Sequence, residues 1–335
     1  MSPANPVLVE ATRGGLVESR HRGAYAVVDA AGRLVAARGE IGRVTFPRSS
    51  MKILQAIPLI ESGAADAFAC TPAELALACA SHSGEAMHVE AVGAWLARIG
   101  RGEADLVCGP QMPAYVPAAE AMIREGRHPC RLHNNCSGKH AGFLTLARHL
   151  GARAAGYNRR EHPVQQAVFA AVAGLTGAGE DMAFGIDGCA APAPALPLQG
   201  LALAMARIAA PDGLPPARAE AVSRLRAAMA AHPELVAGTG RACTRLMRAA
   251  APGTVVKVGA EAVYIGILPA LGLGLALKID DGGTRAAELL VAALLDRFGQ
   301  IRPEARGDIA DLLAPLLRNW AGDEVGALRL APDWA

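Results

Sequence analysis

The two ends of the chain carry short apolar runs with interspersed polar positions, a pattern typical of strands in a half-buried sheet. Near the N-terminus, Asp29-Ala30-Ala31-Gly32 separates two such runs and predicts a hairpin turn. Strands are predicted at residues 7–12, 24–29, 34–37, 254–258, 263–268 and 273–279.

Between these two groups of strands, apolar residues recur at helical spacing over a long stretch. Thr71-Pro72-Ala73-Glu74 is a capping box with proline at the first helical position, and Gly100 and Gly151 follow helical runs as stops. The apolar run 53–60 predicts a buried helix bent at Pro58. Further helices are predicted at residues 71–80, 86–99, 117–126, 140–150, 162–175, 197–210, 214–231, 284–298 and 306–317.

This order of strands, helices and strands predicts an α/β fold of the α+β kind. The first and last strand groups are expected to form one antiparallel sheet, with the helices beside it. A chain of 335 residues can bury a large core, and we expect one catalytic unit. Its sheet-containing part is expected at residues 1–45 and 250–335, and a mainly helical part at 46–249.

The first chemically suggestive segment, Phe46–Lys52, lies where the strands give way to helices. Pro47 suits the first turn of a helix, where its missing N–H costs nothing. Ser49 and Lys52 are three residues apart and share one helical face. This is the Ser-x-x-Lys arrangement of acyl-transfer enzymes in which a lysine activates the serine. The alternative is a serine at a helix start followed by a solvated lysine.

Lysine is rare in this chain, which raises the interest of Lys52. The sequence has 29 arginines but only four lysines, and the other three are Lys139, Lys257 and Lys278. Arginine keeps its proton in proteins, whereas a buried lysine can lose it. A general base or a metal ligand must be unprotonated, so these lysines are candidates for jobs that arginine cannot perform. Random placement under a compositional bias is the competing explanation.

Composition excludes several classes of function. The net charge is +2 and aromatic residues make up 4%, so neither a nucleic acid nor an acidic membrane surface is indicated as a partner. No apolar run reaches membrane-spanning length and residues 1–10 do not resemble a signal peptide, so a cytoplasmic location is predicted. The seven cysteines form no regular framework, and we expect thiols, some of them metal ligands.

Two later segments complete a set with Ser49 and Lys52. Ser81-His82-Ser83 is expected on a loop between two helices, and Lys257-Val258-Gly259 on a strand near the C-terminus. Serine β-lactamases and penicillin-binding proteins carry Ser-x-x-Lys, a serine-bearing loop and Lys-x-Gly in this order. The competing interpretations are a capping serine and an exposed edge-strand lysine. Lys278, beside Asp280, is interpreted as a strand-end ion pair or as the second active-site lysine.

The sequence also resembles the asparaginase II family, the rhizobial-type or class 3 L-asparaginases. The resemblance covers nearly the whole chain and is most specific at residues 133–140. It is carried by Phe46-Pro47-Arg48-Ser49, Ser81-His82-Ser83-Gly84-Glu85, His133-Asn134-Asn135-Cys136-Ser137-Gly138-Lys139-His140, Asp187-Gly188-Cys189 and Lys278-Ile279-Asp280-Asp281-Gly282.

The resemblance implies a homodimeric amidohydrolase with a glutaminase- and β-lactamase-like fold. It implies two serine–lysine tandems, which match Ser49 with Lys52 and Ser81 with Lys257, with Lys278 as the alternative lysine. It also implies a zinc ion beside the active site. The matching ligands are Cys136, Lys139 and Cys189, with Asp187 holding a metal-bound water.

The residues themselves are compatible with zinc. Cys136 and Lys139 are three apart at a helix start, and Asp187 and Cys189 are two apart, so each pair can share a face. Two thiolates, one nitrogen and a water make an open tetrahedral set. Two buried cysteines beside a hydrogen-bonded lysine are the alternative.

The expected reaction is hydrolysis of L-asparagine to L-aspartate and ammonia. Uncharged Lys52 would take the proton of Ser49, and Ser81 with Lys257 would relay a proton to the leaving ammonia. Candidates for gripping the amino-acid head group or supporting the site are Arg48, His133, Asn134 and Asn135. Glutaminase, a β-lactam-recognising hydrolase and a non-enzymatic zinc or amino-acid sensor are the alternatives.

Overall fold

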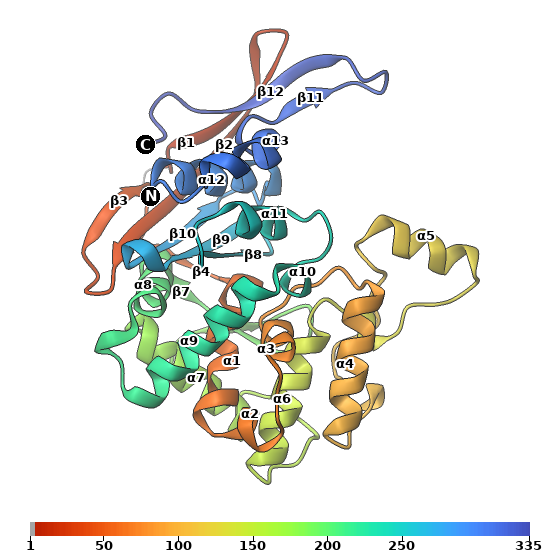
Figure 1. The fold of residues 1–335 in the computed structure, drawn as a ribbon. Helices are drawn as coiled ribbons and strands as arrows, with labels where there is room; N and C mark the ends of the chain where they lie inside the picture. The colour runs from red at the N-terminus through yellow and green to blue at the C-terminus, as the bar shows by residue number, and fades with distance from the viewer. Residues whose placement is uncertain (1–3) are drawn as a thin grey trace. The chain divides into compact units, whose positions relative to one another are not determined.

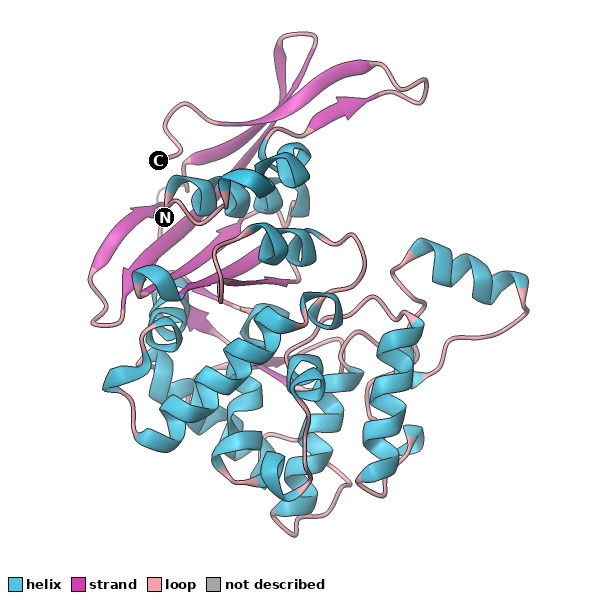
Figure 2. Cartoon of the chain, viewed as in Figure 1, coloured by secondary structure: helices cyan, strands magenta, loops and turns pink. Residues whose placement is uncertain are grey.

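The computed structural model describes residues 4–335, which fall into two compact units. The sheet unit comprises Met1–Ser50, Leu196–Ala210 and Arg245–Ala335, and the helical unit comprises Met51–Ala195 and Pro211–Thr244. The sequence-based division differs in three places, because residues 46–50, 196–210 and 245–249 group with the sheet unit. The predicted α+β fold class is confirmed, since strands from both chain ends form one antiparallel sheet and the middle of the chain is mainly helical (Figures 1 and 2).

The sheet unit is built on an eight-stranded sheet in the order β11-β12-β1-β2-β10-β9-β8, with β3 also paired to β2. Every pairing is antiparallel. The strands are β1 (Val7–Arg13), β2 (Leu16–Asp29), β3 (Leu34–Arg38), β8 (Val255–Gly259), β9 (Val263–Leu268), β10 (Leu273–Ile279), β11 (Leu316–Arg318) and β12 (Glu324–Leu330). β4 (Val44–Thr45) and β7 (Leu196–Pro197) form a separate small pair.

Helices cover both faces of this sheet. Gly274 of β10 faces α8 (Leu198–Ala209) so closely that a Cβ there would lie 2.1 Å from the Ala206 nitrogen. On the opposite face of the sheet, Tyr264 of β9 pairs with Leu277 of β10. Its hydroxyl donates a hydrogen bond to Glu288 of α12 (Thr284–Arg297). The unit also contains α13 (Ala310–Leu313), η5 (Pro269–Leu271) and η6 (Pro303–Ile309).

The helical unit is centred on α1 (Lys52–Glu61), in which every residue from Lys52 to Ile60 is buried. Helices α3, α6, α7 and α9 pack around it. Because α1 is buried on all sides, it reads as an apolar run rather than an amphipathic one. The other elements are α2 (Ala64–Ala67), α3 (Pro72–Ala78), α4 (Ala86–Arg98), α5 (Val116–Arg124), α6 (Ser137–His149), α7 (Pro163–Thr176), α9 (Pro216–Ala231), α10 (Pro233–Val236), η2 (Glu103–Asp105), η3 (Arg131–His133), η4 (Pro211–Gly213), β5 (Phe184–Ile186) and β6 (Pro192–Pro194). The short helices η1 (Arg48–Met51) and α11 (Ala242–Ala249) include residues of both units.

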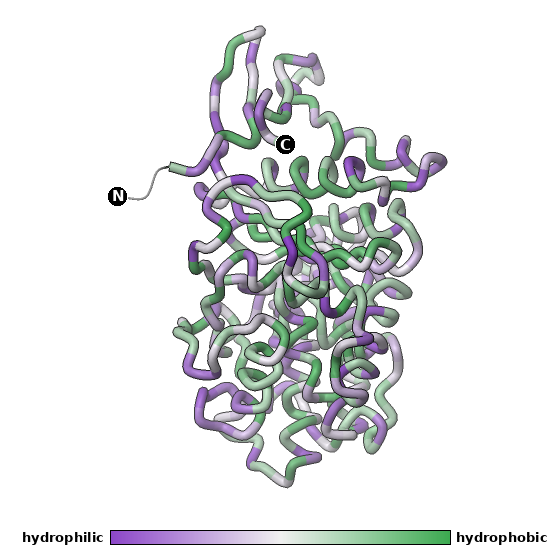
Figure 3. The backbone as a smooth tube through the Cα atoms, turned by 90° about the vertical axis from the view of Figure 1, so that its left-hand side faces the viewer, coloured by the Kyte–Doolittle hydropathy of each residue, from purple (hydrophilic) through white to green (hydrophobic). Residues whose placement is uncertain are grey.

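The structure corrects the sequence interpretation at the Ser49 turn and near the C-terminus. The turn that carries Ser49 is a 3-10 helix, η1, which continues into α1 at Lys52. The predicted helix 306–317 is a 3-10 turn followed by the short α13 and by strand β11, and the final strand β12 was not predicted. Figure 3 shows hydrophilic and hydrophobic residues interspersed along the backbone, including in the hairpin at the top of the view. None of the helices in the described part of the chain is long and apolar enough to cross a bilayer.

Candidate active site

Two adjacent serines follow Pro47, and their surroundings differ. The Ser50 side chain is fully buried and its hydroxyl donates to the Pro47 carbonyl over 2.7 Å. Ser49 is partly exposed, and within residues 4–335 its hydroxyl makes no hydrogen bond. Arg48, directly before it, has a φ of +53°, which is rare for a residue other than glycine. Strained backbone of this kind occurs at active sites, and of the two serines Ser49 is the one whose hydroxyl is not already engaged.

Strand β8 lies close to this serine turn. A Cβ on Gly259 would lie 2.3 Å from the Pro47 carbonyl oxygen and 3.0 Å from the Ser50 nitrogen, so only glycine fits there. This explains the glycine of the Lys-x-Gly motif. Lys257, two residues earlier, is 1% exposed and donates to the Val258 carbonyl. The interpretation of Lys257 as an exposed edge-strand lysine is therefore wrong, although β8 is the last strand in the sheet order.

Lys52 is buried in the helical unit, with 1% of its side chain exposed. Its Nζ lies 3.0 Å from the Ser81 Oγ and 3.4 Å from the Asn135 carbonyl oxygen, and it also donates to the Ala80 carbonyl. If Lys52 is protonated, its three N–H groups can donate one hydrogen bond to each of these acceptors. An uncharged amine can donate to the two carbonyls and accept from the Ser81 hydroxyl. The structure thus joins Lys52 to Ser81, and the pairing of Ser81 with Lys257 stays a prediction.

A buried carboxylate holds the loop that carries Ser81. Glu85 accepts hydrogen bonds from the Ser83 hydroxyl over 2.6 Å and from both the amide and the hydroxyl of Thr239, over 2.9 and 2.6 Å. Burial opposes ionisation of Glu85, but these hydrogen bonds outweigh it and lower its pKa. Gly238 has a φ of +121°, and a Cβ there would overlap the Ser83 Oγ.

His82 connects the same loop to the start of α6. Its Nε2 lies 2.9 Å from the Ser137 Oγ, and its ring stacks on His88 with the ring centroids 4.7 Å apart. Burial and the neighbouring His88 hold the pKa of His82 well below its usual range. The ring is therefore neutral and acts as a fixed hydrogen-bonding spacer between Ser81 and the segment that follows Cys136.

The four predicted head-group residues differ in what their side chains already bind. The amide of Asn134 is fully engaged with backbone, donating to the Gly109 carbonyl over 2.8 Å and accepting from the Cys136 N–H over 2.9 Å. His133 Nδ1 accepts from the Cys130 N–H over 3.1 Å. The side-chain amide of Asn135 makes no hydrogen bond within the described residues. These contacts favour a supporting role for Asn134 and His133 and leave the side-chain amide of Asn135 for ligand contact.

The side chains of two cysteines and a lysine come together at the start of α6 and the β5–β6 turn. Lys139 Nζ lies 3.0 Å from the Cys189 Sγ, and all three side chains of Cys136, Lys139 and Cys189 are buried. The hydrogen bond from Cys136 lowers the pKa of Cys189 to about 4, since together with Lys139 it outweighs burial. The same hydrogen bond raises the pKa of Cys136 to about 12. Burial disfavours the Lys139 ammonium, but the two sulfurs outweigh it and raise the pKa of Lys139.

This donor set fits zinc chemically. Among residues 4–335, no third Cys, His, Asp or Glu joins the two thiols as a metal-binding group, so a zinc ion here would need the Lys139 amine as its third protein ligand. Two thiolates and an amine leave a fourth tetrahedral position for water. Asp187 lies in the tight β5–β6 turn, where its N–H donates to the Ala191 carbonyl and Ala190 adopts a φ of +67°. Its role through a metal-bound water stays a prediction.

Over residues 9–330, the sequence matches the L-asparaginase II family. The chain belongs to this family. It is therefore an amidohydrolase, and a small amide is the substrate class that membership implies. Family membership suggests L-asparaginase activity. No curated protein matches the chain in sequence.

The family member is also similar to solved structures. A β-lactamase from Mycobacterium bovis is 16% identical, with a TM-score of 0.45, over 83% of this chain and 95% of that one. The native form of Mglu, crystallised in 4.3 M NaCl, is 15% identical, with a TM-score of 0.38, over 90% of this chain and 66% of that one.

Some residues around this amidohydrolase site were not predicted. Glu85, His82 and Ser137 belong to segments that the resemblance singled out, but their contacts have no local sequence signal. Thr239 had no signal beyond the two glycines that flank it. Their partners lie up to 154 residues away along the chain, as for Glu85 and Thr239, so only the folded chain reveals them.

Proposed function

We propose that this protein is an L-asparaginase that hydrolyses the side-chain amide of L-asparagine through an acyl-enzyme on Ser49. The observation that carries the proposal is the buried Lys52, held against Ser81 in the helix that directly continues from the Ser49 turn. A lysine enclosed by two carbonyls and a hydroxyl is positioned to accept and return one proton. Ser49, three residues earlier and without a hydrogen bond to a described residue, supplies the nucleophile.

In the proposed reaction, the Ser49 Oγ attacks the amide carbon as its proton passes to the Nζ of uncharged Lys52. Backbone N–H groups at the start of η1 stabilise the oxyanion. Ser81 passes its proton to the departing nitrogen and takes a proton from the Lys52 ammonium in return, the C–N bond breaks and ammonia leaves. Water then attacks the β-aspartyl ester, and the Ser49 Oγ recovers its proton as aspartate is released.

Cys136, Lys139 and Cys189 would hold a zinc ion, which would supply a Lewis-acidic centre with one open position. In this proposal it supports binding and orientation, while the nucleophile is the serine. Asn135 and Arg48 orient the amino-acid head group, because an amide and a guanidinium complement a carboxylate. We also propose a homodimer, as the resemblance implies, and a cytoplasmic location remains a prediction.

The decisive experiment is ammonia release by the purified protein with L-asparagine, L-glutamine and a β-lactam as substrates. We expect L-asparagine to be preferred, although one methylene changes recognition by only about 1–3 kcal/mol. Ser49→Ala should reduce turnover about a thousandfold or more without loss of fold. Turnover of the β-lactam alone would contradict the proposal, and so would absence of ammonia release from any amide.

A specific contact favours one alternative, in which Ser81 is the nucleophile. Ser81 lies 3.0 Å from Lys52 and is itself 7% exposed. Stopping the reaction with acid and locating the β-aspartyl group by peptide mass spectrometry separates the two assignments. We expect the added mass on the peptide that contains Ser49, and its appearance on Ser81 would reverse the roles.

A further inference from the structure

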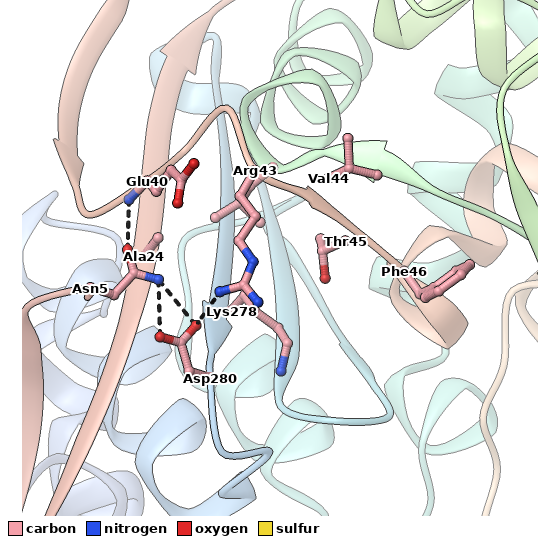
Figure 4. Close-up of a pocket in the computed structure, with 10 residues that line it drawn as sticks. Asn5, Ala24, Glu40, Arg43, Val44, Thr45, Phe46, Lys278 and Asp280 are labelled. Atoms are coloured by element: carbon pink, nitrogen blue, oxygen red, sulfur yellow. Dashed lines mark hydrogen bonds and ion pairs between the residues drawn. The ribbon is translucent and has the colours of Figure 1, made fainter. Parts of the chain in front are cut away.

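A cavity of about 170 Å³ lies within the sheet unit, outside the serine–lysine machinery. Figure 4 shows it between the segment that leads to β4 and the end of β10. Its charged lining residues are Arg43, Lys278, Asp280 and Glu40, and an apolar wall is formed by Val44, Phe46 and Leu198. At roughly 30 Å³ per water molecule, the cavity has room for a ligand of small amino-acid size.

Asn5 fixes the orientation of one of the two carboxylates in this cavity, that of Asp280. Asn5 donates to both oxygens of Asp280, over 3.1 and 3.0 Å, and its own carbonyl accepts the N–H of Glu40 over 2.7 Å (Figure 4). Asn5 is 7% exposed, so a buried amide orients the Asp280 carboxylate, whose side chain is itself 30% exposed. A carboxylate that accepts two hydrogen bonds still has acceptor capacity, which can serve an ammonium group.

The two cations retain donors. The Arg43 guanidinium approaches Asp280 at 3.6 Å and makes no hydrogen bond to a described residue, so its five N–H donors are available to a ligand. Lys278 donates to the Glu261 and Ile279 carbonyls and forms no ion pair with a described residue, so one of its three N–H groups remains. The predicted strand-end ion pair of Lys278 is therefore not formed. Burial, together with the nearby Arg43, lowers the pKa of Lys278, and a bound carboxylate would relieve this repulsion.

The charges of the lining decide the class of ligand. The lining has two positive and two negative side chains, so its net charge is zero. Asp280 and Glu40 would repel a phosphate or another polyanion, and Arg43 and Lys278 would repel a simple cation. A molecule that carries both charges on neighbouring atoms satisfies both pairs. The apolar wall suits an uncharged side chain without hydrogen-bonding groups.

From these observations we infer that the cavity is a second amino-acid site, which binds a free α-amino acid with an apolar side chain as the zwitterion. The carboxylate lies between Arg43 and Lys278, the ammonium faces Asp280, and the side chain packs on Val44, Phe46 and Leu198. Because Phe46 is three residues before Ser49, a ligand here would contact the segment that carries the proposed nucleophile. The inference does not depend on which amide the enzyme hydrolyses.

The test is titration calorimetry of the full-length Ser49→Ala protein with L-valine as the probe. We expect one saturable site per chain, with a Kd of roughly 0.1–10 mM for so small a ligand. L-Valinamide lacks the carboxylate and isovalerate lacks the ammonium, so each should bind at least tenfold more weakly. Arg43→Gln should weaken L-valine binding at least tenfold, whereas Arg13→Gln, which alters an exposed pair with Glu18 in the same unit, should leave it unchanged.

Three results would overturn the inference. One is absence of saturable L-valine binding, and another is binding that Arg43→Gln does not weaken. The third is binding of isovalerate as tight as that of L-valine, since a plain carboxylate site needs no ammonium partner. Ammonia release by the wild-type protein, measured without L-valine, tests the proposed function separately, so either idea can fail alone.

Discussion

At the scale of single residues, the adjacent serines 49 and 50 offer a matched pair of substitutions. Ser50→Ala removes a hydroxyl bonded to the Pro47 carbonyl, which also accepts the Ser50 N–H, so it should cost about 1 kcal/mol of stability. Its turnover should stay within a few fold of wild type, because this hydroxyl is already engaged. Ser49→Ala should show the reverse, with unchanged melting temperature and no measurable ammonia release. If Ser50→Ala is the inactive variant, the nucleophile has been assigned to the wrong serine.

A second residue-scale prediction concerns the protons at the cysteine–lysine cluster. At pH 7, Cys189, with a pKa of about 4, is already a thiolate, whereas Cys136, with a pKa of about 12, and Lys139, whose pKa is raised, both carry protons. Zinc ligation requires all three to be deprotonated, so binding of each zinc ion should release about two protons. Zinc affinity should therefore rise with pH from 6 to 9.

Calorimetry of zinc binding in buffers of different ionisation enthalpy measures this number directly. Cys70→Ser is the control, because Cys70 is a free thiol outside the cluster and should leave proton release unchanged. Release of no protons would mean that zinc binds elsewhere or that Lys139 stays an ammonium, which would leave the cluster as an ion pair only.

At the scale of elements, the loop that carries Ser81 is fixed to the loop at Thr239 by one carboxylate. The pKa of Glu85 lies below its value in the unfolded chain, so its stabilisation is present above about pH 4.5 and is lost as pH falls through the folded pKa. Glu85→Gln keeps the shape but loses charge-assisted hydrogen bonds. It should destabilise the protein by about 1–2 kcal/mol at pH 6 and by much less at pH 3.

Urea unfolding at the two pH values provides the comparison, and ammonia release at pH 7 reports on the placement of Ser81. The matched control is Glu125→Gln, which removes an exposed carboxylate paired with Arg127 and should change neither measurement. A stability loss that is equal at both pH values would show that the Glu85 charge does not hold this loop.

The strands and helices themselves were largely predictable, and the exceptions have physical reasons. β8, β9 and β10 match their predicted ranges within a residue because buried strands read as continuous apolar runs bounded by turns. Residues 306–317 carry a helical pattern, yet residues 316–318 pair with β12, so tertiary pairing overrides local preference. β12 contains Gly326 and Ala327, and Val325 is its single β-branched residue, so its local strand preference is weak.

At the scale of the whole molecule, the sequence predicted which residues belong to the candidate site but not which contacts they make. Ser49, Lys52 and Ser81 stood out because a serine–lysine spacing and scarce lysines are local facts. That Lys52 meets the carbonyls of Ala80 and Asn135 depends on chain segments 28 and 83 residues away. Backbone acceptors carry no sequence signature, so the environment that sets the protonation of a lysine becomes visible only in the fold.

The C-terminal strand closes the sheet against the N-terminal one, which gives the last prediction. β12 pairs with β1 through Val9 and Leu330, and the Ala331 N–H donates to the Leu8 carbonyl, while Leu8 and Val9 are fully buried. Removal of residues 316–335 would expose β1 as an apolar edge strand, which is prone to aggregation. We expect this deletion to abolish soluble expression, whereas removal of residues 332–335 alone should leave solubility and ammonia release intact. A soluble, cooperatively unfolding protein that ends at residue 315 would show that β1 is stable without its partner.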